Sequence, residues 1–161
     1  RKELLKIRPS ERRLEDFGRG IYSDEMSRRT YDRALEIAAE ALGQERSVII
    51  DASYKRRAER LRAFAAAQKL NVDFFLLECV CPEGIVKERL AARQKESADP
   101  SDGRWEIFLA QRTDFDPVKE LPAEFHIVID TARDPDACMT EALSRIRGFK
   151  LEKEGNGKRA A

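Results

Sequence analysis

Apolar residues recur along the chain with the period of an amphipathic helix in its first half. One face of the segment 24–42 collects the positions i, i+3, i+4, i+7 and i+11, namely Tyr31, Ala34, Leu35, Ala38 and Leu42. Ser23 is a suitable N-cap, and Gly43 is a suitable stop after the last periodic residue. The pattern therefore predicts a helix over residues 24–42.

The rest of the chain alternates between short apolar runs and helical periodicity. The apolar runs predict strands at 47–52, 72–80 and 125–130. The helical periodicity predicts helices at 55–69, 82–95, 104–115 and 135–147, with Leu61, Phe64, Ala65 and Gln68 sharing one side of the first. Polar stretches predict loops at 8–23 and 96–103 and a disordered tail at 150–161, while residues 1–7 have a helical pattern. This alternation predicts an α/β fold, a parallel sheet with helices on both faces.

Composition narrows the class of protein. The chain has 161 residues, 31 basic and 30 acidic side chains and a net charge of +1. The length fits one domain, and the charge gives no general attraction to nucleic acid or to an anionic membrane. No apolar run is long enough to span a bilayer. Three cysteines and one histidine make a metal site unfavourable, so we expect reduced cysteines in a cytoplasmic protein.

The ends of the predicted strands are where a ligand is expected, because open α/β sheets bind ligands at the carboxyl edge. Three places should meet there: 51–53, 81–82 and 130–133. Asp51 has two interpretations. It can simply end a strand, or it can be the acid that lies near magnesium in phosphate-loop enzymes. The tetrapeptide VIID is a weak motif on its own.

Arginines follow on the two helices around the loop 96–103. Arg89 and Arg93 are four residues apart and face the same way, and Arg112 lies on the next helix. Guanidinium groups suit phosphate oxygens and can stack on a base. This arrangement favours a flap that covers the strand ends. A solvated amphipathic helix is the alternative.

Three further features have a structural and a functional interpretation. The basic cluster at 55–62 could bind nucleic acid, although such charges are more often a solvated helix face. Trp105 and Phe108 share a helix face with Arg112, and packing is favoured over base stacking. His126 begins a strand without a nearby His or Cys partner, which favours a structural role.

Taken together, these segments resemble small P-loop kinases of the zeta-toxin and gluconate-kinase type. The resemblance is closest to the ATPase-like domain that in some bacteria follows an aminoglycoside-phosphotransferase-like domain. It covers Arg1 to about Gly148. It is carried, in this order, by RKEL, GRGIYSDEMSRRTYDRAL, VIIDASYKRRAER, CPEGIVKERLAAR, DPSDGRWEIFLAQRTDFDP and HIVIDT.

The resemblance implies a P-loop NTPase-like domain at 1–149 with a lid at about 82–116. No part of the sequence matches the phosphate-loop motif G-x-x-x-x-G-K-[ST]. By the resemblance, the first strand, the phosphate loop, the first helix and the general base would lie upstream of Arg1. The strands at 47–52 and 72–80 would then flank an empty position. We expect 48–51 to pair directly with 75–79, a retained gap being the alternative.

The resemblance also implies roles for individual residues. Asp51 would lie near Mg²⁺ without binding it directly, Arg89 would stack on adenine, and Arg93 would reach the phosphates of ATP. Arg112, Thr131 and Arg133 would complete the nucleotide side. The acceptor side would comprise Arg1, Lys2, Arg19, Tyr22 and Ser53.

The leading hypothesis is the carboxyl-terminal part of an ATP-dependent phosphotransferase acting on a small hydroxylated molecule. The chain alone would be inactive, because the missing loop supplies the lysine and hydroxyl that hold phosphate and Mg²⁺. An upstream domain in the same polypeptide is the expected partner. A non-catalytic nucleotide-binding or regulatory module is the first alternative, and a nucleic-acid-binding domain is the second.

Overall fold

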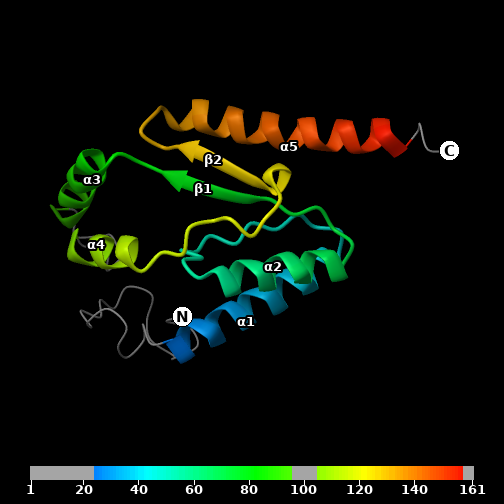
Figure 1. Ribbon diagram of the computed structural model, residues 1–161, viewed down its shortest axis with the longest axis horizontal. Helices are drawn as coiled ribbons and strands as arrows, with labels where there is room; N and C mark the ends of the chain where they lie inside the picture. The colour runs from blue at the N-terminus through cyan, green and yellow to red at the C-terminus, as the bar shows by residue number, and fades with distance from the viewer. Residues whose placement is uncertain (1–23, 96–104, 158–161) are drawn as a thin grey trace. The chain divides into compact units, whose positions relative to one another are not determined.

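The computed structural model describes residues 24–95 and 105–157 (Figure 1). The chain divides into two compact units. The first unit comprises residues up to 73 together with 87–118, and the second comprises 74–86 together with the residues from 119 onward. The predictions for Ser23, for the segments 1–7 and 8–23 and for the loop 96–103 concern residues outside the described ones.

Two packed helices organise the first unit. Helix α1 is Asp24–Leu42 and helix α2 is Arg57–Lys69. They contact each other, and their buried apolar residues are Tyr31 and Ala38 on α1 and Ala63 and Ala67 on α2. Small alanine side chains permit the close approach of two helix backbones. The unit also contains α4, Trp105–Thr113, and most of α3, Glu83–Lys95.

Helix α1 has the predicted bounds, and Tyr31 and Ala38 of the predicted face are buried. The predicted face of α2 is wrong. The buried positions are Arg60, Ala63 and Ala67, whereas Ala65 and Gln68 are exposed and Leu61 and Phe64 are only half-buried. The buried apolar positions of α2 are alanines because their small side chains allow α2 to lie close to α1. Helix α2 also begins at 57 and not at 55.

The predicted strand at 47–52 is not formed. Among the described residues the sheet contains two strands only, so the expected pairing of 48–51 with 75–79 is wrong for this structure. Ile49 is 95% exposed. A strand needs a partner for its backbone groups and a covered face, and the apolar pattern of VIID cannot report whether that partner is present.

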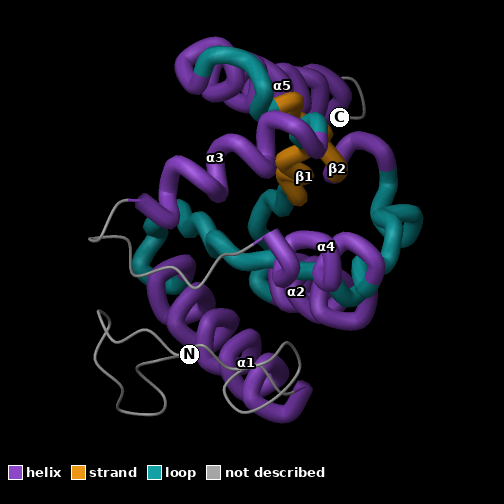
Figure 2. Tube along the Cα trace, turned by 90° about the vertical axis from the view of Figure 1, so that its left-hand side faces the viewer, coloured by secondary structure: helices purple, strands orange, loops and turns teal. Residues whose placement is uncertain are grey.

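The second unit is built on two parallel strands. Strand β1, Leu76–Val80, pairs in register with β2, His126–Asp130, which follows the short 3₁₀ helix Ala123–Phe125. Figure 2 shows α5, Pro135–Gly157, beside these strands. The core consists of Ile127 and Ile129 of β2 packed with Ala142 of α5. The parallel pairing and the α/β class are as predicted.

The second unit departs from the predictions in two places. Strand β1 is shorter than 72–80, and the sheet is not buried on both faces, since Val80 and Val128 are 38% and 46% exposed. Helix α5 continues past Gly148 to Gly157. A glycine inside a helix costs only about 1 kcal/mol relative to alanine, so Gly148 does not by itself end the helix. The following residues, FKLEKE, are mostly good helix formers and carry the helix on.

The start of α5 confirms the predicted cap. The Oδ1 atom of Asp134 accepts hydrogen bonds from the N–H groups of Asp136 and Ala137 at 3.0 and 3.1 Å, and Pro135 takes the first helical position. Among the described residues, no helix is long and apolar enough to cross a membrane.

Candidate functional site

Asp51 and Ser53 lie in the first unit, in the exposed turn that precedes helix α2. Helix α1 reaches this turn through Tyr31. The hydroxyl of Tyr31 lies 3.4 Å from Oγ of Ser53 and accepts a hydrogen bond from the N–H of Tyr54 at 3.0 Å. The turn is therefore anchored to α1 at a point next to the two predicted site residues.

Tyr54 carries the conformational strain of this turn. Its φ is 39°, a left-handed value that non-glycine residues rarely adopt. Its ring lies 4.7 Å from the ring of Tyr31, and its hydroxyl is buried without a hydrogen-bond partner among the described residues. Burial, with smaller contributions from Tyr31 and Glu59, raises the pKa of Tyr54 to about 12. Residues in such conformations persist where surrounding contacts hold them, and they are common at functional sites.

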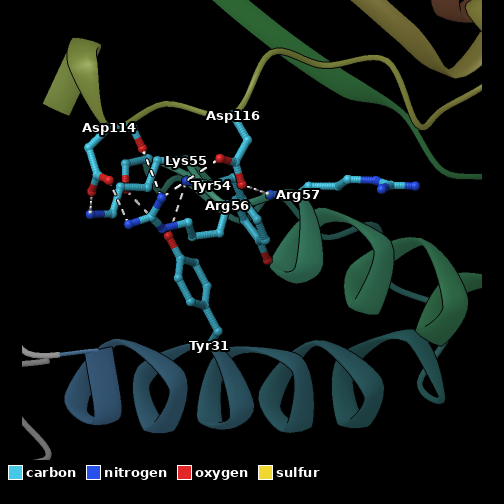
Figure 3. Close-up of polar contacts among 8 residues, drawn as sticks. Tyr31, Tyr54, Lys55, Arg56, Arg57, Asp114 and Asp116 are labelled. Atoms are coloured by element: carbon cyan, nitrogen blue, oxygen red, sulfur yellow. Dashed lines mark hydrogen bonds and ion pairs between the residues drawn. The ribbon is translucent and has the colours of Figure 1, made fainter.

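Two aspartates hold the basic segment that follows the turn. We call Asp114 and Asp116 the aspartate clamp (Figure 3). The Asp114 carboxylate accepts a hydrogen bond from Nζ of Lys55 at 2.6 Å and forms an ion pair with Arg56 at 2.6 Å. These contacts, the Lys55 hydrogen bond above all, lower the pKa of Asp114. The clamp thus pairs the charges of Lys55 and Arg56, which the sequence analysis interpreted as part of a solvated helix face.

Asp116 caps the start of α2. Its Oδ2 accepts a hydrogen bond from the N–H of Arg57 at 2.9 Å, and its own N–H donates to the carbonyl of Lys55 at 2.9 Å. A carboxylate at a helix N-terminus is favourable, because it satisfies free N–H groups and faces the positive end of the helix dipole. This cap comes from a residue 59 positions away, so no local cap appears in the sequence.

Arg60 lies inside this arrangement. It is 1% exposed, and its guanidinium donates to the carbonyls of Tyr54 and Asp116 at 2.9 and 2.8 Å. It also lies 5.3 Å from the centre of the Phe115 ring. Arg62, two residues further along α2, forms ion pairs with Asp32 of α1 and with Glu59. The cluster at 55–62 is therefore largely a set of internal contacts, which favours its structural interpretation over a nucleic-acid surface.

The predicted lid arginines are exposed. Arg89 and Arg93 lie on α3, and Arg112 lies on α4. Trp105 and Phe108 stack on each other at 5.3 Å, with Lys87 beside the first ring and Arg112 beside the second. This stacking agrees with the packing interpretation of the two aromatic residues.

Thr131 and Arg133 lie in the second unit, at the carboxyl end of the sheet. Both the N–H and the hydroxyl of Thr131 donate to the carbonyl of Val80, at 2.8 and 2.9 Å. The places 81–82 and 130–133 are therefore neighbours, as predicted. Arg133 forms an ion pair with Glu141, and this contact is the main cause of the raised pKa of Arg133. At the opposite end of the strand pair, Nε2 of His126, the first residue of β2, lies 2.7 Å from Oε2 of Glu78 on β1, a cross-strand contact that suits a structural role.

Several predictions about the site stay predictions. The acceptor-side residues Arg1, Lys2, Arg19 and Tyr22 lie outside the described residues. Asp51 and Ser53 belong to one unit, while Thr131 and Arg133 belong to the other, so the meeting of all three strand ends is untested.

Sequence reasoning missed the clamp, the buried Arg60 and the strained Tyr54. The available signal was the segment TDFDP at 113–117, in which two acids follow a helix and precede a proline. Their charge complements the basic segment at 55–62. Only the fold shows that the two segments meet.

The described residues alone do not fit a magnesium–ATP site. Asp51 is a single exposed carboxylate, and nowhere in 24–95 or 105–157 do three His, Cys, Asp or Glu side chains come together as metal ligands. A magnesium–ATP site also needs donors for the phosphate oxygens, and the phosphate-loop motif that supplies them is absent from the sequence.

The α/β arrangement with its parallel strand pair is consistent with a P-loop NTPase-like domain. The family model described as an AAA domain matches residues 3–118, more than half of the chain, so the chain belongs to this family. Members of this P-loop family generally bind ATP and Mg²⁺. No curated protein and no solved structure gives a match.

Proposed function

We propose that this chain forms the acceptor and lid part of an ATP-dependent phosphotransferase of the zeta-toxin and gluconate-kinase-like type. The acceptor would be a small hydroxylated molecule. One observation carries the proposal: an AAA domain match over 3–118 that contains an exposed Asp51 after an apolar run and the exposed, phosphate-suited arginines of α3. The phosphate loop would come from a segment outside this sequence.

In this proposal the roles divide by chemistry. Asp51 would orient the reacting hydroxyl or a water of the bound magnesium, and Ser53 would face the acceptor. Arg93 would stabilise charge that develops on the transferred phosphoryl group, while Arg89 and Arg112 would hold the nucleotide. Bound Mg²⁺ would neutralise phosphate charge. Thr131 and Arg133 would border the adenine.

The absence of G-x-x-x-x-G-K-[ST] supports a second candidate, a non-catalytic nucleotide-binding or regulatory module. The coding sequence directly upstream of Arg1 separates the two candidates. A phosphate loop there, followed by an acid shortly before Arg1, favours the phosphotransferase. A coding sequence without that loop favours the module.

Calorimetry tests whether magnesium–ATP binding requires the phosphate loop. The chain alone, titrated with magnesium–ATP, should show no binding tighter than the high-micromolar range, because Arg89 and Arg93 cannot replace the lysine and amide groups of the loop. The gene product that includes the loop should bind magnesium–ATP tightly. Tight, magnesium-dependent binding by the chain alone would contradict the proposal, because it would require a phosphate site elsewhere in these residues.

A further inference from the structure

Arg60 is a cation at an electrostatically unfavourable position of its helix. It lies in the first turn of α2, where the helix dipole disfavours positive charge, and it is 1% exposed. Buried arginines are rare unless their donors are satisfied. Its guanidinium satisfies this condition with two backbone carbonyls, one from Tyr54 before the helix and one from Asp116 after α4. Arg60 therefore joins two segments that are distant in sequence.

One of these segments is the strained turn. Both backbone polar groups of Tyr54 are fixed by side chains, since its N–H donates to Tyr31 at 3.0 Å and its carbonyl accepts from Arg60 at 2.9 Å. The positive φ of 39° is thus held from α1 on one side and from α2 on the other. Left-handed backbone costs energy in a non-glycine residue, so the turn would relax if one of these contacts were lost.

The geometry points to Arg60 as a positioning residue for Asp51 and Ser53. Ser53 directly precedes the strained Tyr54, and Asp51 lies three residues before it in the same turn. We propose that Arg60, by bridging Tyr54 and Asp116, fixes the direction in which this turn presents the Asp51 carboxylate and the Ser53 hydroxyl. The proposal rests on the proposed phosphotransferase function. Arg60 touches no substrate in it and acts only through the turn.

Amide hydrogen exchange tests the structural half of this inference without any activity. In Arg60→Gln, the Tyr54 amide should exchange at least about tenfold faster, because the contact that holds its carbonyl is lost. Arg60→Lys keeps the charge and one donor and should show a smaller increase. The matched control is Arg62→Gln on the same helix, whose ion pairs with Asp32 and Glu59 lie outside the turn, and it should leave this amide unchanged.

Kinetics of the gene product that contains the phosphate loop test the functional half. With ATP as donor and water as the stand-in acceptor, Arg60→Gln should lower kcat by about 10²-fold with little change in the KM for ATP, since a misplaced catalytic group loses rate on this scale. In the double variant with Asp51→Asn, the Arg60 change should add little further loss, because both substitutions disable the same group. Arg60→Lys should restore part of the rate.

The outcomes separate the two proposals. Unchanged exchange at Tyr54 in Arg60→Gln overturns the positioning role whatever the protein catalyses. Faster exchange with an unchanged kcat, or fully additive losses in the double variant, also overturns it and leaves the phosphotransferase standing. Faster exchange in a gene product whose unsubstituted form does not turn over ATP overturns the phosphotransferase, and the positioning role falls with it.

Discussion

Arg60 and Arg93 lie in helical segments of similar basic character, yet the structure gives them opposite environments. Arg60 is almost fully buried and donates to two backbone carbonyls, whereas Arg93 is exposed on α3. A buried guanidinium that bridges two segments uses its N–H donors in contacts within the fold. An exposed one remains in contact with solvent and can meet an anionic ligand. Residue type and spacing alone do not distinguish these two environments.

Other basic residues of the segment 55–62 also form contacts within the fold. Lys55 and Arg56 contact the aspartate clamp, and Arg62 contacts Asp32 and Glu59. Five basic residues near one helix start look like a binding surface in the sequence. In the fold, Lys55, Arg56 and Arg60 contact the segment after α4 and Arg62 contacts α1, while the Arg57 side chain is exposed.

The largest expected effect concerns the buried side of the comparison. Arg60→Ala leaves two carbonyls without their donor and should cost about 3 kcal/mol of unfolding free energy. Arg62→Ala, which removes partly exposed ion pairs, should cost no more than about 1 kcal/mol. Urea unfolding followed by circular dichroism measures both. Equal losses in the two variants would contradict the distinction between them.

Substitution of the exposed Arg93 should change turnover and leave stability nearly unchanged. In the full-length gene product, the role proposed for Arg93 predicts that Arg93→Ala lowers ATP turnover by about 10²-fold, the scale for removing one group that stabilises transition-state charge. Its unfolding free energy should stay within about 0.5 kcal/mol of the unsubstituted protein. Arg145→Ala, an exposed arginine of α5, is the matched control. A loss of turnover shared by Arg145→Ala would remove the special role of Arg93.

Alkaline titration sharpens the account of the strained turn. The pKa of Tyr54 is raised from 10.0 to about 12, so the folded state retains a proton that the unfolded state releases. Stability associated with this group should be present below pH 10 and should fall as the pH rises from 10 toward 12. Ultraviolet absorbance of tyrosinate should show one of the three tyrosines ionising near 12. Tyr54→Phe should remove that step, and a spectrum unchanged by this substitution would contradict the assignment.

Acid titration gives a smaller effect at the clamp. Hydrogen bonds from Lys55 and Arg56 lower the pKa of Asp114 below its usual 3.8. The folded state therefore favours the ionised carboxylate. Its stabilisation should be present above pH 3.8 and should be lost as the pH falls through the lowered pKa. Asp114→Asn should flatten the acid limb of a stability-against-pH curve, and an unaltered acid limb would show that the clamp adds nothing at Asp114.

The smallest expected effect is on nucleic-acid binding. Because the basic side chains at 55–62 other than Arg57 contact partners within the fold, a generic oligonucleotide should bind weakly, with little dependence of the affinity on salt. Fluorescence anisotropy at several salt concentrations measures this. A steep loss of affinity with salt would indicate released counterions and would restore the nucleic-acid interpretation.

Local patterns predicted where the helices and the two strands of the second unit lie along the chain. The bounds of α1, the cap at Asp134 and the strand His126–Asp130 follow from periodicity and from cap and stop residues, all of which act within a few positions. Features that depend on contacts between residues distant in sequence could not be predicted. The strand predicted at 47–52 depends on a partner, and the buried face of α2 depends on the alanines that meet α1.

The candidate site shows the same division. Asp51, Ser53 and the arginines of α3 could be chosen from the sequence because their residue types suit phosphate chemistry. The capping of α2 by Asp116 and the bridge made by Arg60 could not, because each joins residues more than fifty positions apart. The left-handed conformation of Tyr54 also had no signal, since glycine, asparagine or aspartate is the residue expected there.

The proposed phosphate transfer from ATP depends most directly on Asp51. The measurement is steady-state ADP release from magnesium–ATP by the full-length gene product, comparing Asp51→Asn with the unsubstituted protein. The account predicts a loss of about 10²-fold in turnover, with the affinity for ATP nearly unchanged, because the carboxylate acts mainly on the reacting groups. Near-normal turnover in Asp51→Asn would contradict it.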